Sequence, residues 1–490
     1  MKKILIILTP IIIFITIFLY LGKTAIISTS GKTFAEKIAN KIPEKHKTLI
    51  KNVFFKSEIL KLEIRNQSKT INELLDKERK KNNFVVEKFK KIYFEHPFRL
   101  RTNNEDYKLI LFQTKFLANG KNDFAIASGY IDIFQNNLIM VTGDGLLFKI
   151  ALDQLSKSED LYDKEINVGG GFFADLIETN LREIIKTEDF FKQSYYGIKD
   201  ILIVDDKIFL SFSNEVKTDC FNTGILTAEL NLNFTNFKKF SFSNTDCAIK
   251  GKMDNALQGG RMVKYSNEEI MFTHGDWFQD NSAQDKNSIF GKILKFNYVN
   301  GSFDIVSYGH RNPQGLFYLA EKELLFETEH GPIGGDEINI IELNKNNEKN
   351  YGWPIASYGI GTQQTATVFS DGTKKYKSHE GFIEPIKYYV PSLGISEILK
   401  VPNKFLPDDE KNMNFYIATL GTKISEGDLS LHHLKIEKDS NKIIFEDIIH
   451  IQERIRDMIY VDKFNALILF LESDRMKKGG PSIAILKKIK

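Results

Sequence analysis

The stretch "GYIDIFQNNLIMVT" at residues 129–142 consists of two short apolar segments joined by a tight polar turn. Apolar side chains recur along each segment, and the turn between them contains asparagine. This pattern predicts a β-hairpin. A single hairpin cannot bury its own faces, so a partner sheet is expected on each side of it.

The same unit recurs five more times along the chain. The repeats are "IKDILIVDDKIFLSFS" (198–213), "GGRMVKYSNEEIMFTHG" (259–275), "PQGLFYLAEKELLFETEH" (313–330), "GISEILKVPN…NFYIATLG" (394–421) and "IRDMIYVDKFNALILFLE" (455–472). Six hairpins at fairly regular intervals predict an all-β, six-bladed β-propeller, in which radial stacking leaves only short edges. A β-sandwich also contains several hairpins and is the alternative.

Distinctive residues flank these hairpins. In a hairpin, the start of the first strand and the end of the second lie at the same end, so these flanks are expected to share one rim of the propeller. They are "QGGR" (258–261), "HGD" (274–276), "GHRN" (309–312), "EHGPIGGDE" (329–337), "LGTK" (420–423) and "RIR" (454–456). Arginines, carboxylates and Gly-rich turns at a channel mouth suit a small, polar, polyanionic ligand.

Composition narrows the class of protein. The chain has 490 residues, 27% of them charged, and a formal net charge of +3. This near-balance of charge argues against a dedicated nucleic-acid-binding protein, and no nucleic-acid partner is expected.

The N-terminal region differs from the body. Lys2 and Lys3 precede the uncharged run Ile4–Leu21, so residues 1–22 are predicted to form a signal anchor, a transmembrane helix. A cleaved signal peptide, and therefore a secreted protein, is the alternative. Residues 23–98 are predicted to be a helical stalk with a solvated face, followed by the propeller at 99–490. The propeller would then lie on the extracytoplasmic, periplasmic side of the membrane.

Two cysteines, Cys220 and Cys247, lie outside any spacing typical of metal sites. In an exported protein they are expected to form one disulfide, and two unpaired buried thiols are the alternative.

The segment "GHRNPQGLFYLAEKELLFETEHGPIGGDEINIIE…NYGWPIASYG" (309–359) closely resembles the soluble pyrroloquinoline quinone (PQQ) sugar dehydrogenases and their aldose dehydrogenase relatives. The resemblance is strongest over residues 259–360 and extends weakly to "RIRD" at 454–457. It implies a six-bladed propeller, PQQ and calcium as cofactors, and a sugar as substrate.

The resemblance also implies roles for individual residues. The backbone carbonyls of Gly331 and Pro332 would bind the calcium that clamps the quinone, and a hard cation of this kind takes oxygen ligands. Glu337 and the backbone of Tyr351 would hold a second, structural calcium. Asp336 would tighten the turn instead.

Basic and amide side chains would face the carboxylates of the quinone, for which a guanidinium fork is a natural partner. They are Arg261, Arg311, Asn312, Lys423, Arg454 and Arg456. The loosest of these assignments is Lys423. Asp276 in "HGD" matches the acid that orients the catalytic histidine of the family.

The chain departs from the family at the catalytic base. The family places a histidine four residues before the arginine of its "GGR" element, and this chain has Leu257 there. Leucine accepts no proton, so the proton transfer should lose on the order of 10²–10⁴-fold. His274 lies two residues before Asp276 and is a candidate substitute, although an ordinary hydrogen-bonded strand residue is the simpler interpretation. The early segment "GGGFFADL" (169–176) also lacks the glutamine expected beside the quinone.

Three functions follow from these observations. The first is a membrane-anchored, PQQ-dependent aldose dehydrogenase that passes hydride to the quinone and electrons to a further acceptor. The second is a catalytically inactive propeller that binds a glycan, a cofactor or a protein partner. The third and weakest is a calcium-dependent hydrolase or lactonase, for which no histidine dyad is evident.

Overall fold

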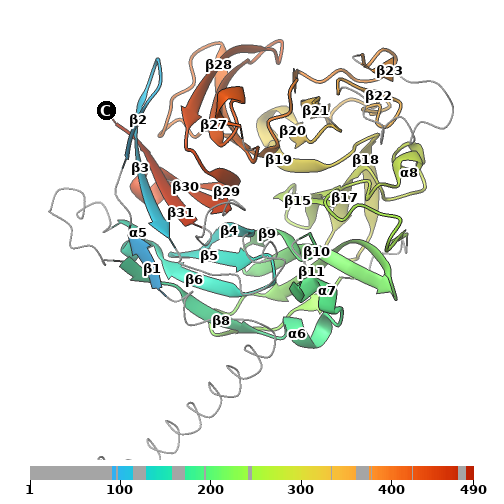
Figure 1. The fold of residues 1–490 in the computed structure, drawn as a ribbon, viewed down its shortest axis with the longest axis horizontal. Coiled ribbons are helices and arrows are strands. Elements are labelled where there is room, and N and C mark those ends of the chain that lie inside the picture. Colours follow the sequence, from blue (N-terminus) through green and yellow to red (C-terminus); the bar gives the residue numbers. More distant parts are fainter. Residues whose placement is uncertain are drawn as a thin grey trace, which may run out of the picture. The chain divides into compact units, whose positions relative to one another are not determined.

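Six β-sheets stand radially around a common axis (Figure 1). The computed structural model describes residues 91–94, 98–113, 128–156, 171–192, 195–240, 246–332, 334–359, 375–376, 378–421, 423–472 and 482–489. All of these residues belong to one unit, Lys80–Lys490. The predicted six-bladed β-propeller is confirmed. The predicted anchor at 1–22 and most of the predicted stalk lie outside the described residues.

Each predicted hairpin forms the two inner strands of one blade. The inner strands are β4 (Gly129–Phe134), β9 (Ile198–Val204), β15 (Gly259–Lys264), β19 (Pro313–Leu319), β25 (Ile395–Lys400) and β29 (Arg454–Val461). Their hairpin partners are β5 (Asn137–Thr142), β10 (Lys207–Lys217), β16 (Glu269–His274), β20 (Leu324–Glu329), β26 (Asn412–Thr419) and β30 (Ala466–Glu472). Four of the hairpin turns contain a residue in the left-handed conformation: Gln135 (φ 55°), Asp205 (φ 54°), Glu323 (φ 50°) and Asn465 (φ 47°). Aspartate and asparagine tolerate this conformation, so Asp205 and Asn465 fit the turns they make.

The outer strands complete each blade. They are β6 (Leu147–Ala151), β8 (Asp175–Thr179) and β12 (Phe234–Thr235) in the first blade, and β11 (Cys220–Glu229), β13 (Lys238–Lys239) and β14 (Ala248–Ile249) in the second. The third has β17 (Lys292–Asn297) and β18 (Phe303–Tyr308), the fourth β21 (Asp336–Glu342) and β24 (Lys387–Tyr389), and the fifth β27 (Ser430–Glu437) and β28 (Ile443–His450).

The sixth blade joins the two ends of the described chain. Strand β31 (Ser482–Lys488) pairs antiparallel with β3 (Asp106–Gln113), so a strand from before the first blade completes the last one. Strands β2 (Phe98–Arg101), β1 (Lys91–Phe94) and β7 (Gly171–Phe173) extend the same sheet. The stalk was predicted to continue to residue 98, whereas residues 91–94 already form a strand of this sheet. Its pairing partners, β3 and β7, are remote in sequence, and a local pattern does not reveal them.

Hydrophobic cores lie between successive blades. One contains Ile131 and Leu138 of the first blade together with Phe470 and Ile483 of the sixth. Equivalent clusters join the other neighbouring blades in turn. Both faces of each blade are therefore buried, as near-continuous apolar runs such as those of β5 and β30 require.

The remaining elements are short. They are the helices α5 (Leu152–Ser156), α6 (Leu181–Ile184), α7 (Glu188–Lys192) and α8 (Asp280–Gln284), the 3-10 turns η3 (Ala320–Lys322), η4 (Ile424–Glu426) and η5 (Asp462–Phe464), and the parallel strand pair β22 (Ala356–Ser357) and β23 (Lys375–Tyr376). Within the described ranges, no helix combines the length and apolar character needed to span a membrane. Cys220 and Cys247 form a disulfide, as predicted for an exported chain.

Equivalent positions of the six inner strands meet at the centre of the ring. They carry Tyr130, Asp200, Arg261, Gly315, Glu397 and Asp457. The Arg261 guanidinium Nη1 lies 2.7 Å from Asp200, 2.8 Å from Glu397 and 3.0 Å from Asp457. One buried cation is therefore shared by carboxylates from three blades.

The same carboxylates connect neighbouring inner strands. Asp457 accepts the backbone N–H of Ile131, and Asp200 accepts that of Met262, at 2.8 Å and 2.7 Å. Burial raises the pKa of Asp200 to about 8. The central cluster thus joins blades through charged hydrogen bonds in a place that water does not reach.

Substitution of Arg261 by methionine should destabilise the propeller by about 3–5 kcal/mol, because it leaves buried carboxylates without their cation. Arg261→Lys keeps the positive charge but not the branched guanidinium group, so it should lower the free energy of unfolding by a smaller amount. The free energy of unfolding in urea at neutral pH measures both. A methionine variant within about 1 kcal/mol of the wild type would contradict this role.

Candidate functional site

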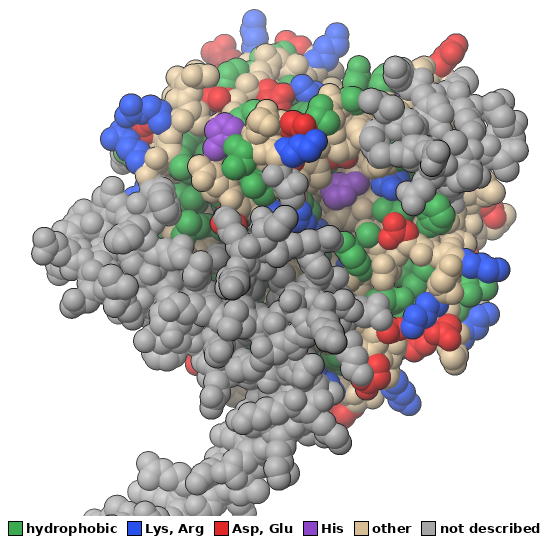
Figure 2. Space-filling view, viewed as in Figure 1, with side chains coloured by type: hydrophobic (Ala, Val, Ile, Leu, Met, Phe, Trp, Pro, Cys, Tyr) green, Lys and Arg blue, Asp and Glu red, His purple; other side chains and the backbone are tan. Residues whose placement is uncertain are grey.

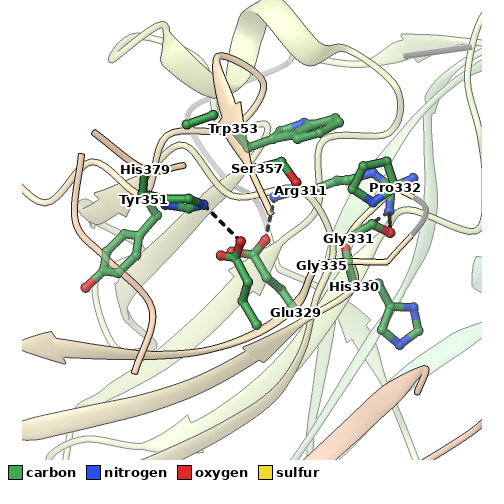
Figure 3. A pocket seen from close by; sticks show the side chains of 12 residues that line it. Arg311, Glu329, His330, Gly331, Pro332, Gly335, Tyr351, Trp353, Ser357 and His379 are labelled. Carbon is green, nitrogen blue, oxygen red and sulfur yellow. Dashed lines mark hydrogen bonds and ion pairs between the residues drawn. The ribbon is translucent and has the colours of Figure 1, made fainter. Parts of the chain in front are cut away.

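A pocket opens at one end of the ring, beside the fourth blade. Figure 3 shows the side chains that line it, and Figure 2 shows basic and histidine side chains near the centre of one face of the molecule. Arg311, Gly331, Pro332, Glu337 and Tyr351 all line this pocket. The fold therefore brings together five residues that the sequence singled out from three separate motifs.

The turn between β20 and β21 is tightly packed and contains glycines in the left-handed conformation. Gly334 and Gly335 have φ angles of 68° and 74°. A Cβ atom at Gly331 would lie 2.3 Å from the carbonyl oxygen of Gly334. Asp336 fixes this turn, because its carboxylate accepts the N–H groups of Gly331 and of Gly394 in the next blade, at 3.0 Å and 2.7 Å. The glycines that precede Asp336 and Glu337 allow a tight turn, so backbone carbonyl groups lie close together at the pocket.

Arg311 spans the pocket floor. Its Nη1 donates to the carbonyl oxygens of His330 and Gly331, at 3.1 Å and 3.0 Å. Its guanidinium carbon also lies 5.4 Å from the centre of the Trp353 ring. Trp353 Nε1 in turn donates to Asp276 Oδ2 at 2.6 Å. The predicted site residue Asp276 is therefore buried beneath the pocket, where it holds the indole that packs against Arg311.

A second set of polar groups continues from this pocket toward the ring axis. Arg456 Nη1 donates to Gln314 Oε1 at 3.0 Å, and Gln314 Nε2 donates to Asn312 Oδ1 at 2.9 Å. Asn312 is the chain neighbour of Arg311, so Arg311 and Arg456 lie at the same end of the ring. Burial is the largest cause of a lowered pKa at His330, and the positive charges of both Arg456 and Arg311 add to it.

This end of the ring carries uncompensated positive charge. Arg454 and Arg456 both pair with Glu472, whose two oxygens accept from their guanidinium groups at 2.9 Å and 2.6 Å. Burial alone would raise the pKa of Glu472, but the charges of Arg456 and Arg454 outweigh it and lower the pKa to about 2. One negative charge therefore faces two positive ones, which favours an anionic ligand.

Sequence reasoning missed Lys199. It lies on β9, and its Nζ donates to the carbonyl of Tyr195 at 2.7 Å. Burial, and then the charge of Arg456, lower its pKa to about 7. The repeat contained a signal for it, because Lys199 precedes Asp200 in "IKD" just as Arg456 precedes Asp457 in "IRD".

Other predicted site residues lie elsewhere. Arg261 is in the central carboxylate cluster, so its charge is already neutralised by acids. Lys423 has a side chain that is 66% exposed and pairs with Glu426. Neither residue lines the pocket, and their contact with a cofactor stays a prediction.

His274 is fully buried on β16. Its Nε2 accepts the backbone N–H of Thr223 at 3.2 Å, and its Nδ1 bonds the carbonyl of Gly275 at 2.8 Å. Burial lowers the pKa of this ring to about 3. Both nitrogens are engaged, so the geometry favours the hydrogen-bonded strand residue over a substitute base. Leu257, at the family's histidine position, is also buried.

Glu337 and His379 also line the pocket, and Glu337 Oε1 lies 2.9 Å from His379 Nε2. Burial is the main cause of a raised pKa at Glu337. Tyr351 is buried nearby, and its hydroxyl donates to the carbonyl of Ile340. A buried carboxylate next to a backbone turn is an arrangement that can hold a cation with oxygen ligands.

Sequence comparison identifies relatives of this chain. The sequence model of the glucose/sorbosone dehydrogenase family matches residues 176–477. An uncharacterised protein of Synechocystis sp. is 28% identical over 44% of this chain and 56% of its own length. Aldose sugar dehydrogenase YliI of Escherichia coli is 32% identical over 28% of this chain and 38% of its own length. Quinoprotein glucose dehydrogenase B of Acinetobacter calcoaceticus is 35% identical over 21% of this chain and 27% of its own length. The matched regions thus span about half of these relatives or less.

Solved structures share the fold. A soluble aldose sugar dehydrogenase of Escherichia coli in its apo form superposes with a TM-score of 0.54 at 18% identity, covering 76% of this chain and 99% of that one. A glucose dehydrogenase superposes with a TM-score of 0.53 at 20% identity, covering 75% of this chain and 98% of that one.

The ion pairs of Glu472 with Arg454 and Arg456 should make the stability of the protein depend on pH. Because its folded pKa is depressed, Glu472 contributes stability that is present above its ordinary pKa and lost as the pH falls toward about 2. The full contribution is roughly 3 kcal/mol. Glu472→Gln should therefore destabilise the chain at pH 6, and the gap to the wild type should narrow at pH 3.

Urea unfolding at the two pH values measures this gap. Glu229→Gln serves as the control, because Glu229 makes an exposed ion pair with Lys207 that should contribute little. A gap for Glu472→Gln that is constant with pH would show that the two arginines do not hold this carboxylate in its charged form.

Proposed function

We propose, from the premise that this chain belongs to the glucose/sorbosone dehydrogenase family, that it is a sugar dehydrogenase-like oxidoreductase that uses PQQ and calcium. The proposed substrate is an aldose or a similar polar sugar. The observation that carries the proposal is the pocket in which Arg311, the Gly331 carbonyl and Glu337 meet at the positively charged end of the ring.

The oxygen donors of the pocket fit calcium. The carbonyl oxygen of Gly331 accepts from Arg311, so it is directed to the pocket rather than into a strand ladder. Gly331 has no room for a Cβ atom, which keeps the neighbouring carbonyls close together. Calcium prefers carbonyl and carboxylate oxygens, so Gly331 and Pro332 would hold one ion, and Glu337 with the backbone of Tyr351 would hold a second.

The charge of the rim fits a polyanionic quinone. The guanidinium of Arg311 donates only to carbonyl oxygens in the described hydrogen bonds, and Arg454 and Arg456 share a single acid. These guanidinium groups, with Asn312 and Lys199, would bind and orient the carboxylates of PQQ. When bound, the calcium-clamped quinone supplies a hydride acceptor, which the side chains of this protein do not.

The residues of the chain then have binding and positioning roles. Asp276 holds Trp353 against Arg311, so the indole fixes the angle at which the guanidinium meets the pocket. Asp336 holds the carbonyl turn against the fifth blade. Both acids preorganise groups that would otherwise have to be ordered by the ligand.

A propeller that binds its ligand without turnover is the second candidate function. Leu257 stands at the position of the family's base, and both nitrogens of His274 are engaged by the backbone. Lys199 keeps a pKa of about 7, but its ammonium is bonded to Tyr195. The same pocket would then present a glycan, the quinone or a protein partner without oxidising it.

We also propose an extracytoplasmic location with an N-terminal membrane anchor. The Cys220–Cys247 disulfide supports this location, because such bonds persist in oxidising compartments. The uncharged run Ile4–Leu21 after two lysines supports the anchor. A secreted form after signal cleavage is the alternative, and an electron acceptor would lie in the same compartment.

Calorimetric titration of PQQ into the calcium-loaded full chain tests the cofactor assignment. We expect one quinone per chain, and we expect Arg311→Gln to weaken binding at least about tenfold, because it removes a charge-assisted hydrogen bond. Lys207→Gln is the matched control, since Lys207 is exposed, pairs with Glu229 and lies outside the pocket. Unchanged binding in Arg311→Gln, or no binding at all, would remove quinone from the proposal.

Leu257→His tests whether the rest of the site is intact. Bleaching of a dye acceptor in the presence of an aldose, PQQ and calcium should be weak or absent in the wild type. The variant should gain on the order of 10²–10⁴-fold, because a histidine there restores a general base. A variant that binds the quinone but gains nothing would favour the inactive binder.

A further inference from the structure

A group of buried polar side chains lies behind the pocket, on the face of the fourth blade that packs against the third. Glu327 pairs across the sheet with Asn339, and Glu329 pairs with Glu337. The next pair on this face is Leu325 with Ile341, and both belong to the hydrophobic core between the two blades. The carboxylates therefore enter an interior where only apolar neighbours would be expected.

His310 reaches this group from the third blade. Its Nδ1 lies 3.3 Å from Glu329 Oε1. One ligand atom from each of His310, Glu327 and Glu329 can be chosen so that all three lie within 4.8 Å of one another. The exposed fractions of these residues are 0%, 0% and 4%, so bulk water does not screen their charges.

Two oxygen atoms in this group lack partners. Asn339 Nδ2 donates to Glu327 Oε2 and to Glu329 Oε1, both at 3.1 Å. Glu327 Oε1 and Asn339 Oδ1 remain buried and have no hydrogen-bond partner among the residues that the structure describes. Each unpaired buried acceptor costs free energy, so two of them beside a histidine nitrogen indicate a group that the protein alone does not provide.

The charges of this group are also uncompensated. Within the described part of the chain, no lysine or arginine forms an ion pair with Glu327, Glu329 or Glu337. Arg311 approaches Glu329 only through its backbone N–H. Burial, and then the charge of Glu329, raise the pKa of Glu327 well above its ordinary value. Either protons or a cation must neutralise these carboxylates.

The surroundings of His310 match those of a metal ligand. Its Nε2 lies 2.8 Å from Ser307 Oγ, which leaves Nδ1 to face the carboxylates. Its ring stacks on Tyr351 with centroids 4.7 Å apart, so its orientation is fixed. A metal-binding histidine is usually held in this way, with its other nitrogen bonded to a neighbouring oxygen.

We propose that His310, Glu327 and Glu329 bind a divalent transition-metal cation, with Asn339 Oδ1 as a further ligand. An imidazole nitrogen among carboxylates suits Mn²⁺ or Zn²⁺, whereas Ca²⁺ takes oxygen ligands. This site is separate from the calcium positions at Gly331 and Glu337, and it does not depend on quinone binding. Glu329 also lines the pocket, which gives the ion a route of entry.

Metal binding by the full chain tests this proposal. The protein is stripped with a chelator, saturated with millimolar Ca²⁺, and then titrated separately with Mn²⁺ and with Zn²⁺. Elemental analysis after desalting counts the retained ions, and pulsed electron paramagnetic resonance detects a nitrogen ligand on Mn²⁺. We expect one retained ion per chain and one imidazole signal, with Ca²⁺ already present.

Glu327→Gln is the decisive variant, because it removes one charge with little change of shape. Its affinity for Mn²⁺ should fall at least about tenfold. Its melting temperature without metal should equal or exceed that of the stripped wild type, and Mn²⁺ should no longer raise it. Glu446→Gln is the matched control, since Glu446 is also a carboxylate and pairs with a histidine, His432, but lies in the fifth blade. It should keep its Mn²⁺.

Other outcomes would overturn the proposal. Equal Mn²⁺ binding by the wild type and Glu327→Gln would show that the cluster is held by protons alone. Loss of Mn²⁺ in Glu337→Gln but not in Glu327→Gln would place the ion at the calcium position. If Glu327→Gln fails to fold, His310→Gln replaces it, and persistence of the imidazole signal in that variant would exclude His310 as the ligand.

Discussion

The antiparallel pairing of β31 with β3 is the interaction on which the arrangement depends. In the sixth blade, β31 from the end of the chain pairs with β3, which precedes the first blade, so the ring is closed by backbone hydrogen bonds between the two ends of the described chain (Figure 1). Closure removes the open edges that radial sheets would otherwise expose. It also fixes the inner strands around one axis, and this arrangement determines the position in space of the motifs that flank each hairpin.

Two kinds of charge arrangement follow from this closure. At the centre, Arg261 is surrounded by acids from neighbouring blades and is part of the scaffold. At the rim, Arg454 and Arg456 share Glu472, and Arg311 faces carbonyl oxygens, so positive charge remains for a ligand. Arginine thus has two roles in this fold. Arg261 stabilises the centre of the ring, whereas the arginines at the rim are placed to bind a ligand. Behind the rim, Glu327 and His310 add buried charge that the fold itself does not explain.

Much of this could be predicted from the sequence because hairpins are local. The recurrence of apolar residues identified all six inner hairpins, five of which have an Asn- or Asp-containing turn, and the flanks of those hairpins identified the rim. The roles of Arg261 and Lys199 could not be separated in this way. Both lie at the starts of inner strands, and a shift of one position decides between the central cluster and the rim. The proposed metal-binding group could not be predicted from the sequence either, because His310 and Glu327 come together only when the third and fourth blades pack against each other. The closing strand pair, and with it the place of residues 91–94 in the sheet of the sixth blade, depends on contacts between separate strands.

The most direct test of the account is a crystal structure of the full chain grown with calcium and PQQ. It should show the quinone in the pocket beside the fourth blade, with its carboxylates in contact with Arg311 and Arg456 and with calcium on the Gly331 carbonyl. Quinone bound at any other surface of the propeller, or a pocket that stays empty at saturating concentrations, would contradict the claim that ring closure assembles this site.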